Sequence, residues 1–285
     1  MKKPRPKPTP APVDYRTVGR VSLVGAGPGV VDLLTLRAVR RLETADLVLY
    51  DALVDDDVVA LAANAQRFSV GKRARRGAEA QPRTRATSQA IINRLMIRAA
   101  RTGKRVVRLK CGDPFVLGRG GEEALALRDA GVPFEVVPGV TSAVAAPALA
   151  GVPITHRGIS SGFLVVSGHD EDAFAPLVDP LPPNSVTIVV LMGLATRGRI
   201  AARLIRAGWR AETPTAVVLA AGAPAMRTWR GPLQALGKDD VEAVGADGAP
   251  GTLVIGDVVA LGSSLRGRLP TPTRESVAFG GRHTR

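Results

Sequence analysis

The chain has 285 residues, of which 45% are hydrophobic, so it is long enough to bury one large core or two medium ones. No uninterrupted apolar run approaches the roughly 20 residues that span a bilayer, which argues against a membrane protein. Aromatic residues make up only 4%, which leaves little material for stacking nucleic-acid bases. One cysteine excludes an internal disulfide and fits a reducing cytoplasm, and with three scattered histidines it makes no zinc site.

The formal net charge is +14, and much of it lies in the two ends and in residues 67–105. Such a field could attract nucleic acid, a membrane or a polyanionic small molecule, and charge alone does not choose among them. Residues 1–19 are rich in proline and charge and predict a disordered tail without a secretory signal. Residues 266–285 are polar and basic, which also predicts disorder, and residues 75–85 predict a mobile surface loop.

The first elements follow the pattern of a strand, a glycine-rich turn and a helix. Residues 21–24 are an apolar strand that ends in the sequence GAGPG. Residues 32–43 have helical spacing, with Asp32 or Thr35 as the cap. The next strand, residues 47–50, ends at Asp51. The chain therefore begins like a dinucleotide-binding fold, with an acid about 20 residues after the glycines.

One residue in the GAGPG turn and one directly after it argue against a dinucleotide ligand. Val30 replaces the third glycine of the dinucleotide pattern, and Pro28 has no backbone N–H to donate to a pyrophosphate. A ligand without phosphates suits this turn better.

In the rest of the chain, predicted strands continue to alternate with predicted helices. In the first half we expect strands at 67–70, 106–110 and 134–137, and helices at 58–65, at 87 or 88 to 100, and at 143–150 with a bend at Pro147. In the second half we expect strands at 163–167, 186–192, 215–219 and 252–259 and a helix at 197–207. Alternation in both halves indicates two α/β domains, which we place at 20–151 and 152–265.

The chain is organised around one stretch, RVVRLKCGDPFVLGRGGEE at residues 105–123. Its alternating start predicts a strand with one face in a core. Gly112 and Pro114 then end the strand, and Glu122 and Glu123 open a helix that stops at Gly131. This arrangement places backbone groups and a carboxylate at the carboxyl end of a sheet, where open α/β folds bind ligands.

Taken together, the turns resemble those of the uroporphyrinogen-III C-methyltransferase family, within the tetrapyrrole methylase superfamily. The resemblance runs from about Val21 to Leu265. Its motifs are VGAGPG with DLLTL, VLYDALV, VGKRA, the 105–123 stretch, PFEVVPGVTSA, GVPITHR, SGH and MGL. The chain departs from the family at Val30-Val31, Cys111, Ala221-Gly222-Ala223 and Leu191.

The resemblance implies two α/β domains with an active site between them, in a cytoplasmic homodimer. It implies transfer of two methyl groups from S-adenosyl-L-methionine to C2 and C7 of uroporphyrinogen III. The product, precorrin-2, forms via precorrin-1 and feeds siroheme and cobalamin synthesis. No metal, nucleic acid or membrane is expected. A polycarboxylate substrate suits an arginine-lined cleft, and methylation by a sulfonium needs no protein nucleophile.

The resemblance also assigns site residues. Asp51, at a strand end, is the expected base, and Lys72 is the paired acid or a counter-charge. Arg119 and Arg157 are candidates for substrate carboxylates. The donor is expected to contact Pro28, Cys111, Gly112, Asp113, Val116, Thr141, Ser142, Met192 and Gly222. Without the family, Asp51 and Asp113 could each simply cap a turn, and Met192 could be core.

Three alternatives remain open. A sister enzyme would methylate a later precorrin. A nicotinamide-dependent oxidoreductase would require the missing third glycine. A nucleic-acid-binding protein would require stacking aromatics or a recognised module.

Overall fold

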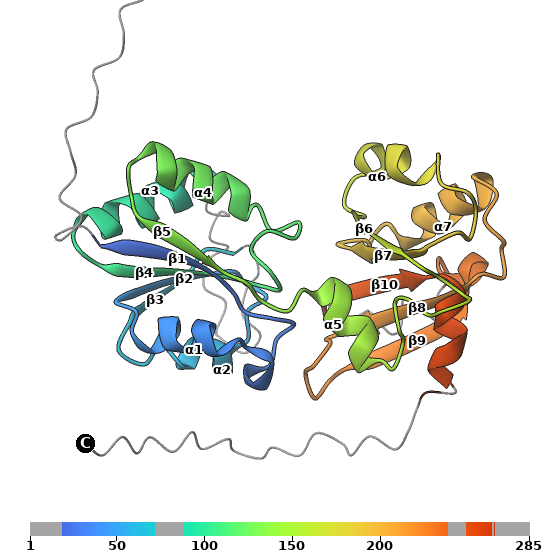
Figure 1. The fold of residues 1–285 in the computed structure, drawn as a ribbon, viewed down its shortest axis with the longest axis horizontal. Helices are drawn as coiled ribbons and strands as arrows, with labels where there is room; N and C mark the ends of the chain where they lie inside the picture. Colours follow the sequence, from blue (N-terminus) through green and yellow to red (C-terminus); the bar gives the residue numbers. More distant parts are fainter. Residues whose placement is uncertain (1–18, 72–87, 239–248, 264, 266–285) are drawn as a thin grey trace, which may run out of the picture.

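The computed structural model describes residues 19–71, 88–238, 249–263 and 265, which form two five-stranded sheets. Figure 1 shows the two sheets side by side, each with helices on both faces. The predicted loop at 75–85 and the tail at 266–285 lie outside these residues, as does the tail at 1–19 apart from Gly19, which is buried. In the described part of the chain, no helix is long and apolar enough to cross a membrane.

The first sheet is entirely parallel, in the order β3-β2-β4-β1-β5. Helices α1 and α2 cover one face and α3 and α4 the other (Figure 1), and a separate apolar cluster fills each interface. The bounds are β1 Arg20–Gly25, α1 Leu36–Glu43, β2 Leu47–Tyr50, α2 Asp56–Ala60, β3 Gln66–Ser69, α3 Gln89–Arg101, β4 Arg105–Lys110, α4 Gly120–Asp129 and β5 Phe134–Val137.

The second sheet is mixed, in the order β6-β7-β10-β8-β9, with only β6 and β7 parallel. Helices α6 and α7 pack on one face through a cluster that includes Phe174 and Trp209. The bounds are α5 Ser142–Leu149, β6 Phe163–Ser167, α6 Glu171–Val178, β7 Thr187–Leu191, α7 Arg197–Arg206, β8 Pro214–Leu219, β9 Arg227–Pro232 and β10 Gly251–Ile255.

Helix α5 follows the first sheet in the chain but packs against the second. Its buried residue Ala146 lies in one apolar cluster with Ala216 of β8 and Val254 of β10. In Figure 1, α5 correspondingly lies between the two sheets, against β10 and β8. The division after residue 151 stays a prediction, and this packing favours a boundary before Ser142.

The expectation for β4 was wrong in one respect, because both faces of this strand are buried. β4 is the central strand of a parallel sheet that is covered on both sides, and Arg108 and Lys110 are only 2% and 3% exposed. Helix α4 lies over them and supplies Glu123, which is completely buried. The basic residues that alternate with apolar ones in β4 therefore face the interface between the sheet and α4, and not solvent.

Smaller differences concern where elements start and stop. The helix expected at 32–43 divides into a 3-10 turn, Val31–Leu33, and α1, which Thr35 caps by accepting from Ala38 N at 3.2 Å. The helix expected at 58–65 is the shorter α2. The strand expected at 252–259 ends at Ile255, because a 3-10 helix follows Gly256. Helix α5 runs to Leu149 with Pro147 inside it.

Candidate active site

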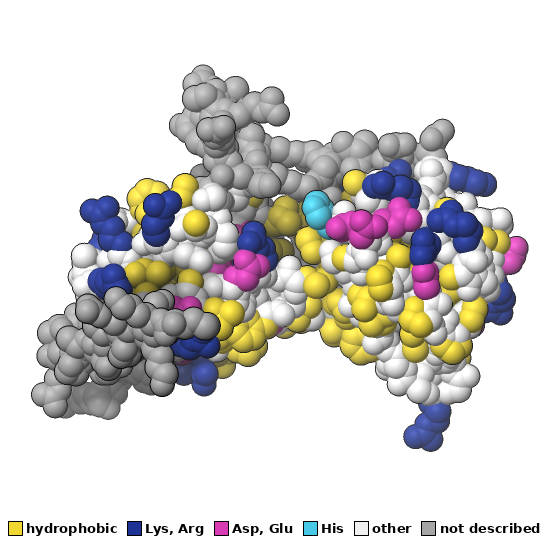
Figure 2. Space-filling view, turned by 90° about the horizontal axis from the view of Figure 1, so that it is seen from above, with side chains coloured by type: hydrophobic (Ala, Val, Ile, Leu, Met, Phe, Trp, Pro, Cys, Tyr) yellow, Lys and Arg dark blue, Asp and Glu magenta, His cyan; other side chains and the backbone are white. Residues whose placement is uncertain are grey.

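A cleft of about 650 Å³ lies where the two sheets meet, and Figure 2 shows the surface hollowed between the two halves. It opens at the carboxyl ends of β1, β2, β4 and β5, as open parallel sheets predict. The first half lines it with Pro28, Asp51, Leu53, residues 111–113, 116–118, Thr141 and Ser142. The second half lines it with Leu191, Met192, Leu194, Ala195, Arg197, Val218, Ala221 and residues 249–252.

Three loops of the first half touch backbone to backbone at the floor of the cleft. A Cβ atom on Gly25 would lie 2.5 Å from Gly112 O, and one on Gly139 would lie 2.3 Å from the same oxygen. Gly27 and Gly112 exchange two backbone hydrogen bonds, with N···O distances of 3.2 and 2.8 Å. The N–H of Gly27 is therefore used within the fold, which agrees with a ligand that has no pyrophosphate.

Asp113 fastens two of these loops together. Its Oδ1 accepts from Phe115 N at 2.8 Å, and its Oδ2 accepts from Gly139 N at 3.1 Å. Asp113 therefore does cap its own turn, and it lines the cleft as well. The two interpretations of this residue are compatible.

A buried ion network lies directly behind Asp51. Arg108 donates from Nη2 to Asp51 Oδ1 and from Nε to Glu123 Oε1, the latter at 2.9 Å. Lys110 Nζ lies 3.2 Å from Glu123 Oε2 and 4.0 Å from Asp51 Oδ2. Gln89 of α3 donates to Glu123 Oε1 at 3.0 Å. Two cations and two carboxylates thus form a group without net charge, with only Asp51 reaching the cleft.

Burial and charge act differently on the members of this network. Burial alone would lower the pKa of Arg108, but the charges of Asp51 and Glu123 outweigh it and raise that pKa. For Lys110, burial and the positive charge of Arg108 outweigh the charges of Asp51 and Glu123, so the pKa of Lys110 is lowered. Burial, with help from the Asp51 charge, raises the pKa of the Cys111 thiol to about 11. At neutral pH Cys111 is therefore a thiol rather than a nucleophilic thiolate.

Strained backbone is concentrated around the cleft. Leu117 and Met192 both line it, and they have φ angles of 52° and 58°. Arg119 and Ala220, which lie next to lining segments, have φ angles of 58° and 48°. Left-handed conformations cost non-glycine residues free energy, and they are enriched at functional sites as well as in turns. Their clustering identifies this cleft as the best candidate site.

Most of the residues assigned from the sequence meet in this cleft. They are Pro28, Asp51, Cys111, Gly112, Asp113, Val116, Thr141, Ser142 and Met192. Gly222 is not in the lining, but its neighbour Ala221 is, and a Cβ on Gly222 would lie 3.2 Å from Val30. Lys72 lies outside the described residues.

The two assigned arginines do not line the cleft. Arg119 is exposed and pairs with Glu122 at 2.6 Å, and Arg157 is exposed in the turn after Val152. Sequence analysis missed Arg197, which is the one cation among the described residues that line the cleft. It also missed the partnership of Arg108, Lys110 and Glu123. Two basic residues in a strand between other apolar strands were a signal for it, because buried cations need buried anions.

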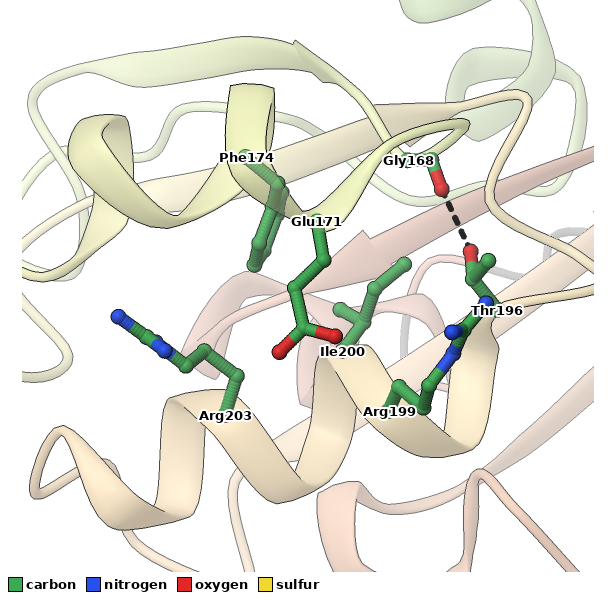
Figure 3. Close-up of a pocket in the computed structure, with 7 residues that line it drawn as sticks. All are labelled: Gly168, Glu171, Phe174, Thr196, Arg199, Ile200 and Arg203. Carbon is green, nitrogen blue, oxygen red and sulfur yellow. Dashed lines mark hydrogen bonds between the residues drawn. The ribbon is translucent and has the colours of Figure 1, made fainter.

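Between α6 and α7, a hollow in the second half holds only about 10 Å³, which is about the least that one ordered water requires; Figure 3 shows the residues that line it. There the Thr196 hydroxyl donates to Gly168 O at 2.6 Å (Figure 3). A Cβ on Gly168 would lie 2.5 Å from the Cα of Gly193. The SGH and MGL motifs thus have a structural role, because they hold two βα turns together behind the cleft. In the described part of the chain, no group of three or more His, Cys, Asp or Glu could hold a metal ion.

Comparisons with known proteins agree with this fold. The model of the family Tetrapyrrole (Corrin/Porphyrin) Methylases matches residues 20–237. A siroheme synthase of Neisseria meningitidis is 45% identical over 250 residues, covering 87% of this chain. The chain spans only about half of that relative, 49% of its length.

Two further relatives are matched over nearly their whole length. A uroporphyrinogen-III C-methyltransferase of Methanocaldococcus jannaschii is 40% identical, over 85% of this chain and 97% of its own. The crystal structure of the uroporphyrin-III C-methyltransferase of Thermus thermophilus complexed with S-adenosylhomocysteine is 42% identical with a TM-score of 0.68, over 85% of this chain and 100% of its own. With a family match over most of its length and a two-lobed cleft fold, the chain belongs to the tetrapyrrole methylases.

Proposed function

We propose that this protein is an S-adenosyl-L-methionine-dependent uroporphyrinogen-III C-methyltransferase. It methylates C2 and C7 of uroporphyrinogen III and yields precorrin-2, via precorrin-1, for siroheme and cobalamin synthesis. The observation that carries the proposal is the cleft, in which loops from both sheets bring together nine of the assigned residues, the carboxylates of Asp51 and Asp113 among them. The high identity to relatives of that name supports the same substrate.

The cleft fits the methyl donor in size and charge. Its volume of about 650 Å³ lies within the range of small-molecule sites. The loops that we propose hold the donor carry Pro28, Gly112, Thr141 and Met192. Asp51 and Asp113 give the lining two carboxylates, which suits a sulfonium cation. Backbone groups of the tightly packed glycine loops would make most of the contacts, because side chains there are small.

The reaction asks the protein for positioning and for one proton acceptor. Bound S-adenosylmethionine supplies an electrophilic methyl group. The carbon–sulfur bond breaks with its electrons staying on sulfur, and an electron pair of the pyrrole carbon forms the new carbon–carbon bond. The methylated macrocycle then carries one positive charge and loses one proton. We propose that Asp51 accepts this proton, since it is the network's carboxylate that reaches the cleft.

Carboxylates of the substrate need cations at the rim. Arg197 at the start of α7 lines the cleft and donates from Nη1 to Leu194 O at 2.9 Å, which holds the guanidinium at the wall. We propose Arg197 as one carboxylate contact. Arg119 and Arg157 stay proposals for the outer carboxylates, and Lys72 stays a proposal for the acid or counter-charge. Arginine suits this task because its planar fork binds carboxylates with two hydrogen bonds.

We further propose a cytoplasmic homodimer. Several large apolar side chains on and around α5 are exposed by a third or more, including Val140, Val144, Leu149, Ile159 and Phe163. Exposed apolar side chains become available for an interface when they lie together, and those of Val140 and Val144 are four residues apart at the start of α5. A second copy of this chain is the occupant we propose, as the family implies. The single cysteine, a free thiol in the cleft, fits a reducing compartment.

The nearest alternative is a methyltransferase that acts on a later precorrin, which would use the same cleft. A nicotinamide-dependent oxidoreductase fits the structure less well, because the N–H of Gly27 is already bonded to Gly112. No observation on the fold favours a nucleic-acid ligand.

Substituting Asp51 by Asn tests the proposed chemistry. The change keeps size and hydrogen bonding but removes the charge, so turnover of uroporphyrinogen III should fall by about 100- to 10,000-fold. The affinity for S-adenosylhomocysteine, measured by calorimetry, should change little, because the three glycine loops are untouched. Turnover at the unmodified rate would show that Asp51 only closes its turn.

A further inference from the structure

We propose that Glu123 is a positioning residue, which acts on Asp51 through Arg108 and so ties the cleft loop before α4 to the reacting carboxylate. The inference rests on the proposed function, because it takes Asp51 as the proton acceptor. Glu123 itself is 0% exposed and does not line the cleft.

The first step is the geometry of Arg108. Its Nε donates to Glu123 and its Nη2 to Asp51, while Nη1 donates to the carbonyls of Leu49 and Leu109 at 3.3 and 3.1 Å. Glu123 therefore fixes Nε of the guanidinium, and two strand carbonyls fix Nη1. The remaining nitrogen is aimed at Asp51. With Arg108 fixed in this way, the rotamer of Asp51 is fixed as well.

The second step concerns charge. Arg108 and Lys110 lie close to Asp51, and Glu123 is the anion that offsets one of these two cations. Gln89 is neutral, and the Cys111 thiol has its pKa raised to about 11, so neither adds charge near neutral pH. Without Glu123, Asp51 would be the sole counter-anion of both cations among the described residues. It would then hold its negative charge more firmly and be a weaker base.

The third step connects the network to the cleft wall. Glu123 sits in the first turn of α4, directly after the loop that contributes residues 116–118 to the cleft. A Cβ on Gly118 would lie 3.4 Å from Lys110 Cε, so this loop rests on the stem of Lys110. Gln89 brings in the start of α3. A shift of the cleft loop is therefore passed to Glu123, and from there to Arg108 and Asp51.

Two variants separate charge from orientation. Glu123→Gln keeps the shape of the side chain but removes its negative charge. The acid limb of the pH profile, where kcat/KM falls because the proposed base becomes protonated, should therefore shift to lower pH by about 1 pH unit or more. Its kcat should fall by up to about 100-fold from misplacement. Arg108→Met with Glu123→Gln removes one cation together with one anion. The acid limb should then return toward that of the unmodified protein, while kcat stays low because the guanidinium that orients Asp51 is gone.

Glu135→Gln is the matched control. Glu135 is also an ion-paired glutamate, bonded to Arg41 and to Ser22 Oγ, the latter at 2.8 Å, but it lies on β5 outside the cleft lining. It should leave both kcat and the acid limb unchanged. KM for S-adenosylmethionine should also stay within about 2-fold in every variant, which is well under 1 kcal/mol of binding, because Glu123, Arg108 and Glu135 do not line the cleft.

The outcomes distinguish this inference from the function on which it rests. If Asp51→Asn is slow and a folded Glu123→Gln keeps the normal acid limb and kcat, Glu123 is structural only and the inference is overturned. If Glu123→Gln does not fold, the charge-balanced double variant decides, and normal kcat in it overturns the inference. Normal turnover of Asp51→Asn would overturn both the inference and the proposed chemistry.

Discussion

Gly139 offers the sharpest test of how the floor of the cleft is built. A methyl group added there would lie 2.3 Å from Gly112 O and 2.7 Å from Gly25 Cα. Both neighbours are backbone atoms, and Gly27 and Asp113 hold the same loops by hydrogen bonds. The methyl group cannot turn away, so Gly139→Ala has to push the loops apart.

The size of the effect follows from these distances. Ordinary contact begins at 3.4 Å, so the loops must separate by about 1 Å. Overpacking of this kind costs about 1–3 kcal/mol, and for a chain of this size each kcal/mol lowers Tm by about 2–4 °C. A displacement of about 1 Å at a reacting centre can cost about 100-fold in rate. We therefore expect a modest loss of stability and a large loss of donor affinity and turnover.

Thermal unfolding, calorimetry with S-adenosylhomocysteine and a turnover assay measure these three effects. Gly121→Ala is the matched control, because a Cβ there meets nothing within 4 Å and Gly121 lies inside α4. Alanine should stabilise that helix by up to about 1 kcal/mol. If Gly139→Ala bound S-adenosylhomocysteine as tightly as Gly121→Ala does, the floor of the cleft would not be the donor site.

Two further predictions concern single groups with shifted pKa values. Asp46 accepts three hydrogen bonds from Arg105, chiefly from its side chain, which lowers the Asp46 pKa to about 2. The pair is partly exposed, so Asp46→Asn should cost only about 0.2–1 kcal/mol. A carboxyl group whose pKa is lowered by folding stabilises the fold at pH values above its pKa in the unfolded chain, about 3.9 for Asp. The difference in unfolding free energy between the unmodified protein and Asp46→Asn, measured by urea titration, should therefore shrink as the pH falls from about 3.9 toward 2. A difference that stays constant over this range would argue against the ion pair. Because the pKa of Cys111 is raised to about 11, its alkylation by iodoacetamide should be slow at pH 7, accelerate toward pH 11 and be reduced by S-adenosylhomocysteine. Rapid labelling at pH 7 would contradict the raised pKa of this thiol.

The sequence predicts the apolar strands best. β2, β5 and β6 have the predicted bounds, because each is a short β-favouring run between turn residues. The missed elements lack such a run. β9, with the sequence RTWRGP, is a partly exposed edge strand that pairs only with β8, and its polar composition resembles a loop. Helix α6 has only eight residues and contains Pro176, although Asp170 does cap it.

The site is predicted less evenly than the strands. Turn residues such as Pro28, Gly112 and Thr141 are found because strand ends of a parallel sheet meet at one edge. The buried pairing of Arg108 with Glu123 depends on α4 folding back over β4, a tertiary contact that alternation along one strand does not encode. Arg197 enters the cleft only because the second sheet faces the first.

Methyl transfer to uroporphyrinogen III is the measurement that tests the central claim most directly. The purified protein would be incubated anaerobically with uroporphyrinogen III and S-adenosylmethionine that carries a deuterated methyl group, and the tetrapyrrole would be analysed by mass spectrometry. The account predicts a product that carries two labelled methyl groups, formed through a singly labelled intermediate, with an equivalent amount of S-adenosylhomocysteine. A tetrapyrrole that remains unlabelled, although the protein is folded and binds S-adenosylhomocysteine, would contradict it.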